Sequence, residues 1–195
     1  MLSEKLKNYN IILASGSPRR QQFFKDLGLE FEIRLKPVDE VYPLELKGAE
    51  ITDYLAQLKS IPFKEELKDN DILITSDTIV WHKNKALGKP KSEEDAFNII
   101  KSLSYDYHEV ITSVCFTLKN DTKVVYDITK VYFKKLSDDE INYYIKTFQP
   151  FDKAGAYGIQ EWIGLIGVEK LEGSYFNVMG LPTHLVYKTL LSIVS

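Results

Sequence analysis

The chain has 195 residues, of which 44% are hydrophobic and 27% charged, ordinary proportions for a globular protein that exclude disorder as its main state. Its 25 Lys and Arg against 28 Asp and Glu give a net charge of -3, so we expect no general nucleic-acid binding, which needs a basic face. The single cysteine, Cys115, cannot form an internal disulfide. No apolar run approaches the roughly 20 residues that span a bilayer, and the polar beginning lacks the apolar core of a signal peptide. These features predict a cytoplasmic protein without a membrane partner, and they leave open whether it is a monomer or a homodimer.

The first predicted elements are a strand and a helix on either side of a Ser-Gly-Ser turn. The apolar run at residues 10–14 predicts a buried strand. Ser17 suits the N-cap of the following helix, Pro18 its first position and Gly28 the residue after its end. The sequence therefore predicts that this helix begins directly after the turn.

A strand at residues 31–35 and an amphipathic helix at residues 46–60 come next. Two further apolar segments, residues 72–75 and 78–81, predict strands that meet near Asp77. This acidic side chain is thus expected at a strand end.

The second half is predicted to contain a helix followed by a hairpin. Ser92 and Asp95 resemble a capping box for a helix that ends at Leu103. Two stretches rich in β-branched and aromatic residues, 109–118 and 124–134, predict the hairpin.

The last part is predicted to consist of two helices around a glycine-rich segment. Ser137 and Glu140 form a capping box, residues 151–177 are predicted to be loop and strand, and Pro182 begins a final helix. Strands and helices alternate early and a hairpin follows, which predicts an α/β fold with a mixed β-sheet flanked by helices.

The turn at Ser15 is the first candidate for chemistry. A strand that runs into a Gly/Ser turn and a helix start presents free backbone N–H groups and the positive end of the helix dipole. Arg19 and Arg20, in the first helical turn, add donors suited to phosphate oxygens. The alternative is a surface turn with two solvated arginines. Two positive side chains are unfavourable at the positive end of the helix dipole, and a bound anion would offset that cost. The pair of arginines therefore favours phosphate binding.

Four charged residues elsewhere are weaker candidates. Asp77 could bind Mg²⁺ or accept a proton from water. Lys59, at the end of the second helix, and Lys89, in a Gly-Lys-Pro loop, could neutralise phosphate, and Glu40 could add to a metal site. Taken singly, each of them is more commonly a turn residue or a solvated side chain.

Gln160 ends a glycine-rich segment, residues 153–160. Small residues let the backbone approach a ligand closely, and the amide of Gln160 has both a donor and an acceptor that could read a base edge. The alternative is a crossover loop with an exposed glutamine. The histidines lack metal-ligand spacing, and His108 is expected to pack or to form hydrogen bonds.

Six segments in order, LASGSPRR, SDTIV, GKP, HEVITSV, DKAGAYGIQ and GSYFNVMGLP, resemble the Maf family of nucleotide pyrophosphatases, also described as septum formation inhibitors. They extend from about Ile12 to the last helix, and LASGSPRR with KAGAYGIQ is the specific combination. The resemblance implies one domain over residues 1–195, similar to inosine triphosphate pyrophosphatases, with two lobes around a central cleft. It also implies a divalent metal and release of pyrophosphate from a nucleoside triphosphate.

The resemblance further implies roles for particular residues. The catalytic residue is Asp77, which with Glu40 would hold Mg²⁺ or Mn²⁺. The residues implied to contact the substrate phosphates are Ser15, Arg19, Arg20, Lys59 and Lys89.

Within the family, the branch that acts on dTTP and UTP carries residues matching Arg19, Thr78 and Gln160. The branch acting on 7-methyl-GTP has a tryptophan after Ser-Pro and a glutamate-bearing loop, which this sequence lacks. Glu161 and Trp162 depart from the family's glycine-rich continuation and are expected to narrow the base pocket.

The resemblance thus predicts an enzyme that hydrolyses dTTP and UTP, with modified pyrimidine nucleotides left open, through attack of water on the α-phosphate. Two alternatives remain open at this stage: a non-catalytic, nucleotide-sensing regulator of cell division, and a broader house-cleaning pyrophosphatase for modified bases.

Overall fold

The computed structural model describes residues 1–194 and divides into two compact units. Unit 1 comprises residues 1–77, residues 112–127 and the chain from Gly180, and unit 2 comprises residues 78–111 and 128–179. Three strands contribute one part to each unit: β3 (Asp71–His82), β5 (Tyr107–Thr117) and β6 (Thr122–Phe133).

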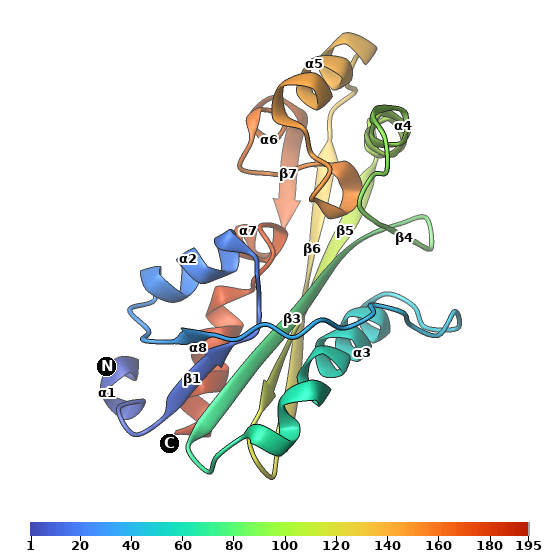
Figure 1. Ribbon diagram of the computed structural model, residues 1–195. Helices are drawn as coiled ribbons and strands as arrows, with labels where there is room; N and C mark the ends of the chain where they lie inside the picture. Colours follow the sequence, from blue (N-terminus) through green and yellow to red (C-terminus); the bar gives the residue numbers. More distant parts are fainter. Residues whose placement is uncertain (195) are drawn as a thin grey trace. The chain divides into compact units, whose positions relative to one another are not determined.

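Unit 1 alternates strands and helices (Figure 1). Besides its parts of β3, β5 and β6, its elements are α1 (Leu2–Lys5), β1 (Asn10–Leu13), α2 (Pro18–Asp26), β2 (Glu32–Ile33), α3 (Ala49–Ser60), the 3-10 helix η1 (Ile61–Glu66) and α8 (Thr183–Ile193). Strand β1 pairs in parallel with both β2 and β3, because the connecting segments return each strand in the same direction. The predicted alternation of strands and helices is therefore confirmed.

Helix α3 is fixed to the unit-1 strands by hydroxyl groups. Thr75 of β3 donates a hydrogen bond from Oγ1 to the carbonyl oxygen of Ala56, at 2.6 Å. The hydroxyls of Thr52 and Ser113 are 2.6 Å apart, and Ser113 also donates to Asp53 Oδ1 at 2.6 Å. These bonds satisfy buried polar groups and set the position of the helix that ends with Lys59 and Ser60.

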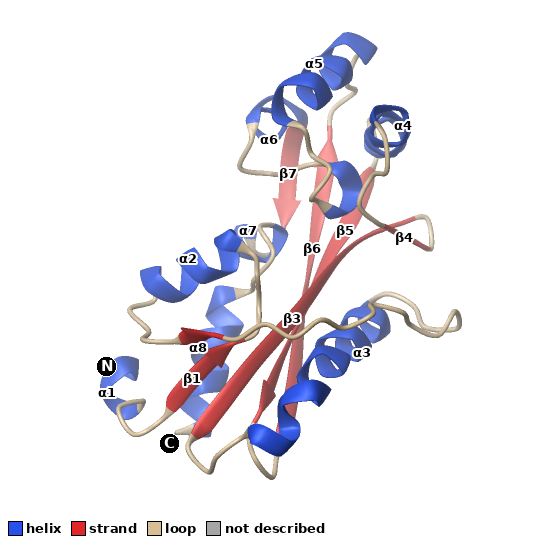
Figure 2. Ribbon diagram, viewed as in Figure 1, coloured by secondary structure: helices blue, strands red, loops and turns tan. Residues whose placement is uncertain are grey.

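Unit 2 contains four helices, a 3-10 turn and two short strands besides its parts of β3, β5 and β6 (Figure 2). They are β4 (Lys85–Leu87), α4 (Glu93–Leu103), α5 (Asp138–Phe148), η2 (Ala154–Ala156), α6 (Trp162–Gly167), β7 (Val168–Glu172) and α7 (Tyr175–Val178). β4 pairs antiparallel with β3, and β7 antiparallel with β6. Helix α4 packs against α5 and η2, around buried side chains that include Ile100, Phe133, Tyr144 and Tyr157.

The strand order is β2-β1-β3-β5-β6-β7, with β4 paired to β3. Parallel pairs at β1 and antiparallel pairs at β4 and β7 make this a mixed sheet, as predicted. Within residues 1–194, no helix has the length and apolar character that a membrane crossing requires.

The sequence-based prediction differs from the structure at several points. Residues 72–75 and 78–81 belong to one continuous strand, so Asp77 lies within β3 rather than at its end. The predicted loop and strand at residues 151–177 also contain α6 and α7. Asp95 does not complete a capping box, because its carboxylate accepts from the backbone of Lys91 rather than from Ser92.

Candidate functional site

The turn between β1 and α2 has the predicted local structure. Ser17 is the N-cap residue of α2, and its side chain accepts from the backbone N–H of Arg20 at 3.5 Å. The hydroxyl oxygen of the buried Ser15 accepts from the backbone N–H of Ser17 at 3.3 Å, and the carbonyl of Ser15 accepts from Gln21. The start of α2 therefore presents the positive end of the helix dipole beside a buried serine, but Pro18 has no N–H and the N–H groups of Arg20 and Gln21 are bonded to Ser17.

Arg20 is anchored by two backbone carbonyls of unit 1. Its Nε donates to the carbonyl of Gly180 at 2.8 Å and its Nη1 to that of Ser76 at 3.0 Å. Burial lowers the pKa of Arg20, attraction from Asp77 opposes that shift, and the neighbouring Arg19 adds repulsion. Since an arginine stays protonated in proteins, Arg20 is a fixed positive charge close to Asp77. Neither contact could be predicted from the sequence, because each joins Arg20 to a segment that is far away in the chain.

Asp77 and Glu40 share the ammonium group of Lys59. Lys59 Nζ lies 2.7 Å from Asp77 Oδ1 and 3.0 Å from Glu40 Oε1. The side chain of Asp77 is only 9% exposed and that of Lys59 17%, whereas Glu40 is 56% exposed. The structure thus brings together three predicted residues from the loop before α3, the end of α3 and the middle of β3.

Burial raises the pKa of the Asp77 carboxyl. Attraction from Lys59, the hydrogen bond with Lys59 and attraction from Arg20 partly oppose this shift, and repulsion from Glu40 adds to it. A carboxylate whose pKa is raised is a better proton acceptor near neutral pH than a solvated one. The environment of Asp77 therefore fits general-base chemistry.

The same two carboxylates fit a divalent cation that is completed by substrate. They converge on one point, which the ammonium of Lys59 occupies, and carboxylate oxygens are the donors that Mg²⁺ prefers. Among residues 1–194, no group of three or more His, Cys, Asp or Glu side chains could hold a metal by itself. A metal here would thus take its remaining ligands from phosphate and water, as Mg²⁺ commonly does.

Three further predicted residues belong to unit 2. Thr78 follows Asp77 on β3, Lys89 lies exposed in the loop between β4 and α4, and Gln160 lies exposed between η2 and α6. The backbone N–H of Gly155 donates to the carbonyl of Gly88 at 3.1 Å. This bond ties together the two loops that carry Lys89 and Gln160.

Gly155 is required in that loop for two reasons. Its φ is +71°, a left-handed conformation that favours glycine, and an added Cβ would lie 2.7 Å from Val80 Cγ2. Gly155 thus lets the backbone of this segment pack closely against β3, whereas the sequence predicted a close approach to a ligand.

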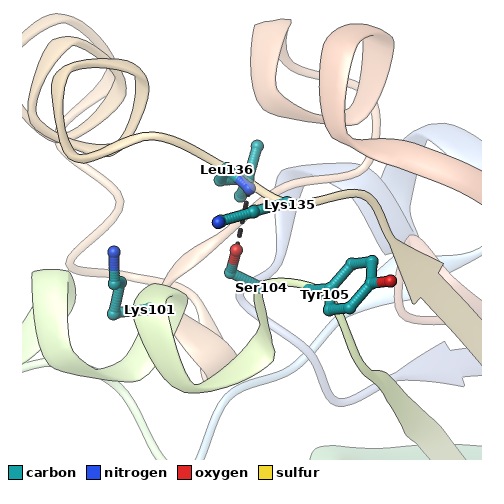
Figure 3. A pocket seen from close by; sticks show the side chains of 5 residues that line it. All are labelled: Lys101, Ser104, Tyr105, Lys135 and Leu136. Carbon is teal, nitrogen blue, oxygen red and sulfur yellow. Dashed lines mark hydrogen bonds between the residues drawn. The ribbon is translucent and has the colours of Figure 1, made fainter.

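A separate surface hollow of about 450 Å³ lies in unit 2 (Figure 3). Its lining is Lys101, Ser104, Tyr105, Lys135 and Leu136. The hydroxyl of Ser104 accepts from the backbone N–H of Leu136 at 2.8 Å, and Lys101 is paired with Asp138. None of the predicted site residues lines this hollow. The Ser104 hydroxyl in its lining is engaged by the backbone N–H of Leu136.

The fold and the family can now be compared with known proteins. The structure resembles that of the Staphylococcus aureus Ham1 protein, with a TM-score of 0.53 and 15% sequence identity, covering 94% of this chain and 99% of that one. At that identity the likeness defines the fold class alone, and it confirms the predicted α/β class.

The sequence then defines the family. Residues 10–193 match the family described as Maf-like protein, and the chain belongs to the Maf family. A protein of Flavobacterium johnsoniae named dTTP/UTP pyrophosphatase is 66% identical over 194 residues, which is 100% of each chain. A protein of Christiangramia forsetii with the same name is 63% identical over 190 residues, 97% of each. The family resemblance in the six sequence segments is therefore confirmed.

Proposed function

We propose that this protein is a nucleoside triphosphate pyrophosphatase that converts dTTP and UTP to the nucleoside monophosphate and pyrophosphate. The observation that carries the proposal is the arrangement of Asp77, Lys59 and Glu40 beside the anchored Arg20. In this arrangement the buried carboxylate of Asp77, which can accept a proton, lies beside the positive charges of Lys59 and Arg20. The names of the two relatives, at 66% and 63% identity, support the choice of nucleotides.

In the proposed reaction the oxygen of a water molecule attacks the α-phosphorus. The bond between that phosphorus and the oxygen bridging to the β-phosphorus breaks, and its electron pair leaves with pyrophosphate. Asp77 takes the proton that the water loses. This role is supported by the burial that raises the pKa of Asp77.

Positive charge and backbone N–H groups would stabilise the departing pyrophosphate. The proposed contacts are Ser15, Arg19, Arg20, Lys59 and Lys89, together with the positive N-terminal end of α2. Fixed donors of this kind stabilise developing charge without reorganising during the reaction.

We propose that Asp77 and Glu40 hold Mg²⁺ or Mn²⁺ when substrate is present. The ion would neutralise phosphate charge and help to orient water. On this proposal EDTA abolishes pyrophosphate release, and added Mg²⁺ restores it. Glu40→Gln should raise the Mg²⁺ concentration needed for half-maximal rate by about tenfold, equivalent to about 1.4 kcal/mol. Asp39→Asn, which alters the neighbouring exposed acid, serves as the control and should leave that concentration unchanged.

The decisive experiment incubates the purified protein with dTTP and Mg²⁺ and measures pyrophosphate and dTMP. Asp77→Asn should lower kcat by about 10²–10⁴-fold, because an amide cannot accept the proton. Near-wild-type turnover of this variant would remove Asp77 from the chemistry. Binding of dTTP without pyrophosphate release would instead support a nucleotide sensor. Faster hydrolysis of 5-methyl-UTP or pseudouridine triphosphate would indicate a house-cleaning role.

Base selection is proposed to depend on Arg19, Thr78 and Gln160. An exposed glutamine amide can offer both a donor and an acceptor to a pyrimidine edge. Gln160→Ala should therefore reduce the ratio of kcat/KM for dTTP to that for CTP by about tenfold, the effect of one lost hydrogen bond. An unchanged ratio across dTTP, UTP, CTP and GTP would remove Gln160 from recognition.

The proposal includes the setting in which the enzyme works. We propose that both units act as one domain over residues 1–195, in the cytoplasm, with nucleotides and without nucleic-acid or membrane partners. The net charge of -3 supports the absence of a nucleic-acid partner. Light scattering of the purified protein distinguishes a monomer from a homodimer.

A further inference from the structure

The side chain of Glu161 contacts residues outside the helix that it precedes. It is the N-cap residue of α6, but its side chain accepts no capping hydrogen bond from that helix. Instead Tyr144 donates from its hydroxyl to Glu161 Oε2, and Lys153 Nζ lies 3.1 Å from Glu161 Oε1. The backbone N–H of Gly158 donates to the Tyr144 hydroxyl at 3.0 Å. We call Tyr144, Lys153, Gly158 and Glu161 the Glu161 clamp.

The clamp is protected from water and belongs to a packed core. Tyr144 is fully buried on α5 and stacks on Phe148 with ring centroids 5.2 Å apart. The side chains of Lys153 and Glu161 are 10% and 18% exposed. Charge-assisted bonds in such a setting are stronger than surface ion pairs. Lys153 Nζ also pairs with the exposed Asp152 at 2.7 Å, so removal of Glu161 would deprive chiefly the buried Tyr144 hydroxyl of its acceptor.

The clamp holds the glycine-rich segment at its beginning, in its middle and at its end. Lys153 begins the segment, Gly158 lies within it, and Glu161 follows Gln160 directly. The backbone N–H of Glu161 also donates to the carbonyl of Gly158 at 3.0 Å, which closes a tight turn around Gln160.

Gly158 shows how closely this turn is packed. A Cβ added there would lie 2.9 Å from Glu161 Cδ and 3.1 Å from Gln160 Nε2. The backbone of Gly158 therefore lies against the side chains of Gln160 and Glu161.

The neighbouring Trp162 also packs on α5. Its ring meets that of Tyr143 edge to face, with centroids 4.8 Å apart. The side chains of Glu161 and Trp162 are both engaged with α5, which indicates a supporting role for this segment.

We infer that Glu161 is a positioning residue, which fixes the backbone at Gln160 through Tyr144 and Lys153 and thereby sets the discrimination among nucleotide bases. The inference rests on the proposed function, in which Gln160 reads a pyrimidine. Glu161 acts through Gln160 and touches neither phosphate nor water in this role. Its loss should raise KM for dTTP more than it lowers kcat.

The first test uses variants that change single groups of the clamp. Tyr144→Phe removes only the hydroxyl, and Glu161→Ala removes the carboxylate. Tyr144→Phe should reduce the kcat/KM preference for dTTP over CTP by about tenfold, the effect of losing one hydrogen bond, and Glu161→Ala, which loses the contacts with both Tyr144 and Lys153, by at least as much. Glu161→Gln, which still accepts from Tyr144 but no longer pairs with Lys153, should have an intermediate effect. Tyr143→Phe on the same helix, at an exposed position, is the matched control.

The second test asks whether Glu161 works through Gln160. In the double variant Gln160→Ala, Glu161→Ala, the preference for dTTP should be no lower than in Gln160→Ala alone. Two losses that multiply would show that Glu161 influences the base independently, and they would overturn the inference. An unchanged preference in both Tyr144→Phe and Glu161→Ala would overturn it as well.

The third test measures the clamp without using activity. Hydrogen exchange of the Gly158 amide, followed by NMR, should be at least about tenfold faster in Tyr144→Phe than in wild type or Tyr143→Phe. Urea unfolding of the same variants separates this local opening from a loss of global stability. An unchanged exchange rate of the Gly158 amide would show that the Tyr144 hydroxyl does not hold this turn in place.

If the wild-type protein releases no pyrophosphate from any nucleotide, the proposed function itself fails and the inference with it. If it does and the preference does not move, only the inference fails.

Discussion

Lys59 places one ammonium group between two carboxylates, Asp77 and Glu40. Because attraction from Lys59 opposes the effect of burial on Asp77, the lysine keeps this carboxylate ionised to a lower pH. The ionised form is the one that accepts a proton. Lys59 thus has an electrostatic role in addition to the proposed phosphate contact.

Lys59→Gln should move the acidic limb of the kcat/KM–pH profile to higher pH. Removal of the opposing charge raises the pKa of Asp77 further, and activity is lost as the pH falls through that pKa. The measurement is the initial rate of pyrophosphate release across the acidic range. Lys64→Gln, at an exposed position in η1, should leave the limb in place, and an unmoved limb in Lys59→Gln would contradict this account.

At the level of single residues, local signals were predictable and long-range contacts were not. Ser17 was correctly predicted as the cap of α2, because its bond joins neighbouring residues. The contact of Lys59 with both acids joins α3, β3 and a loop, and no periodicity encodes it. Glu161 was noticed as an unusual residue, but its partner Tyr144 lies 17 positions away on α5.

Helix α5 begins with a complete capping box. The Ser137 side chain accepts from the backbone N–H of Glu140 at 3.2 Å, and the Glu140 side chain accepts from that of Ser137 at 2.8 Å. Both bonds satisfy donors that the first helical turn leaves without a partner. The box was predicted from sequence, because Ser and Glu stand at the required spacing.

Ser137→Ala should lower the free energy of unfolding by about 1 kcal/mol, whereas Ser137→Gly should cost only a few tenths. The difference arises because glycine favours the N-cap backbone and leaves the N–H groups open to water. Urea unfolding followed by circular dichroism measures both values. Unchanged stability in both variants would show that the Ser137 side chain contributes no capping free energy to α5.

Strand β3 shows why element boundaries were harder to predict than the elements. The polar pair Ser76 and Asp77 interrupts an apolar run and was interpreted as a strand end. In the structure the carbonyl of Ser76 accepts from Arg20, and Asp77 pairs with Lys59, so tertiary contacts allow the strand to continue. In α6, Gly164 and Gly167 lower the helix propensity of the sequence, so the helix is not predicted from it. Gly164 is needed in the structure because a side chain there would collide with the backbone of Ile159.

The stability of the whole molecule should depend on pH through His108. This buried side chain lies in unit 2, with Nε2 2.7 Å from the Tyr157 hydroxyl. Burial first, and then repulsion from His82, lower its pKa from 6.5 to about 3. The folded protein therefore holds His108 neutral over a range in which the unfolded chain binds a proton.

The sign of the effect follows from that depressed pKa. Stability from His108 is complete above pH 6.5 and is lost progressively as the pH falls toward about 3. Between pH 7 and pH 5 this amounts to about 2 kcal/mol, at 1.36 kcal/mol per pH unit. In His108→Asn the loss of stability between the two pH values, measured by urea unfolding, should be smaller by about that amount. The exposed His184 provides the control variant His184→Asn, which should behave like wild type.

The general architecture was predictable because alternating apolar segments and turn residues specify an α/β fold. The division into two units was not predictable in the same way. It depends on which parts of β3, β5 and β6 pack with which helices, and these contacts join segments that are far apart in the sequence.

The route of the chain through the two units has a consequence during protein synthesis. The chain leaves unit 1 after Asp77 and enters it for the last time at Gly180. Val186 and Leu190 of α8 are fully buried in the core, and α8 contacts α1, so apolar side chains of residues 1–77 stay exposed to water until the ribosome has made α8. A nascent chain that stalls before Thr183 should be retained by chaperones or degraded, because its unit 1 lacks α8.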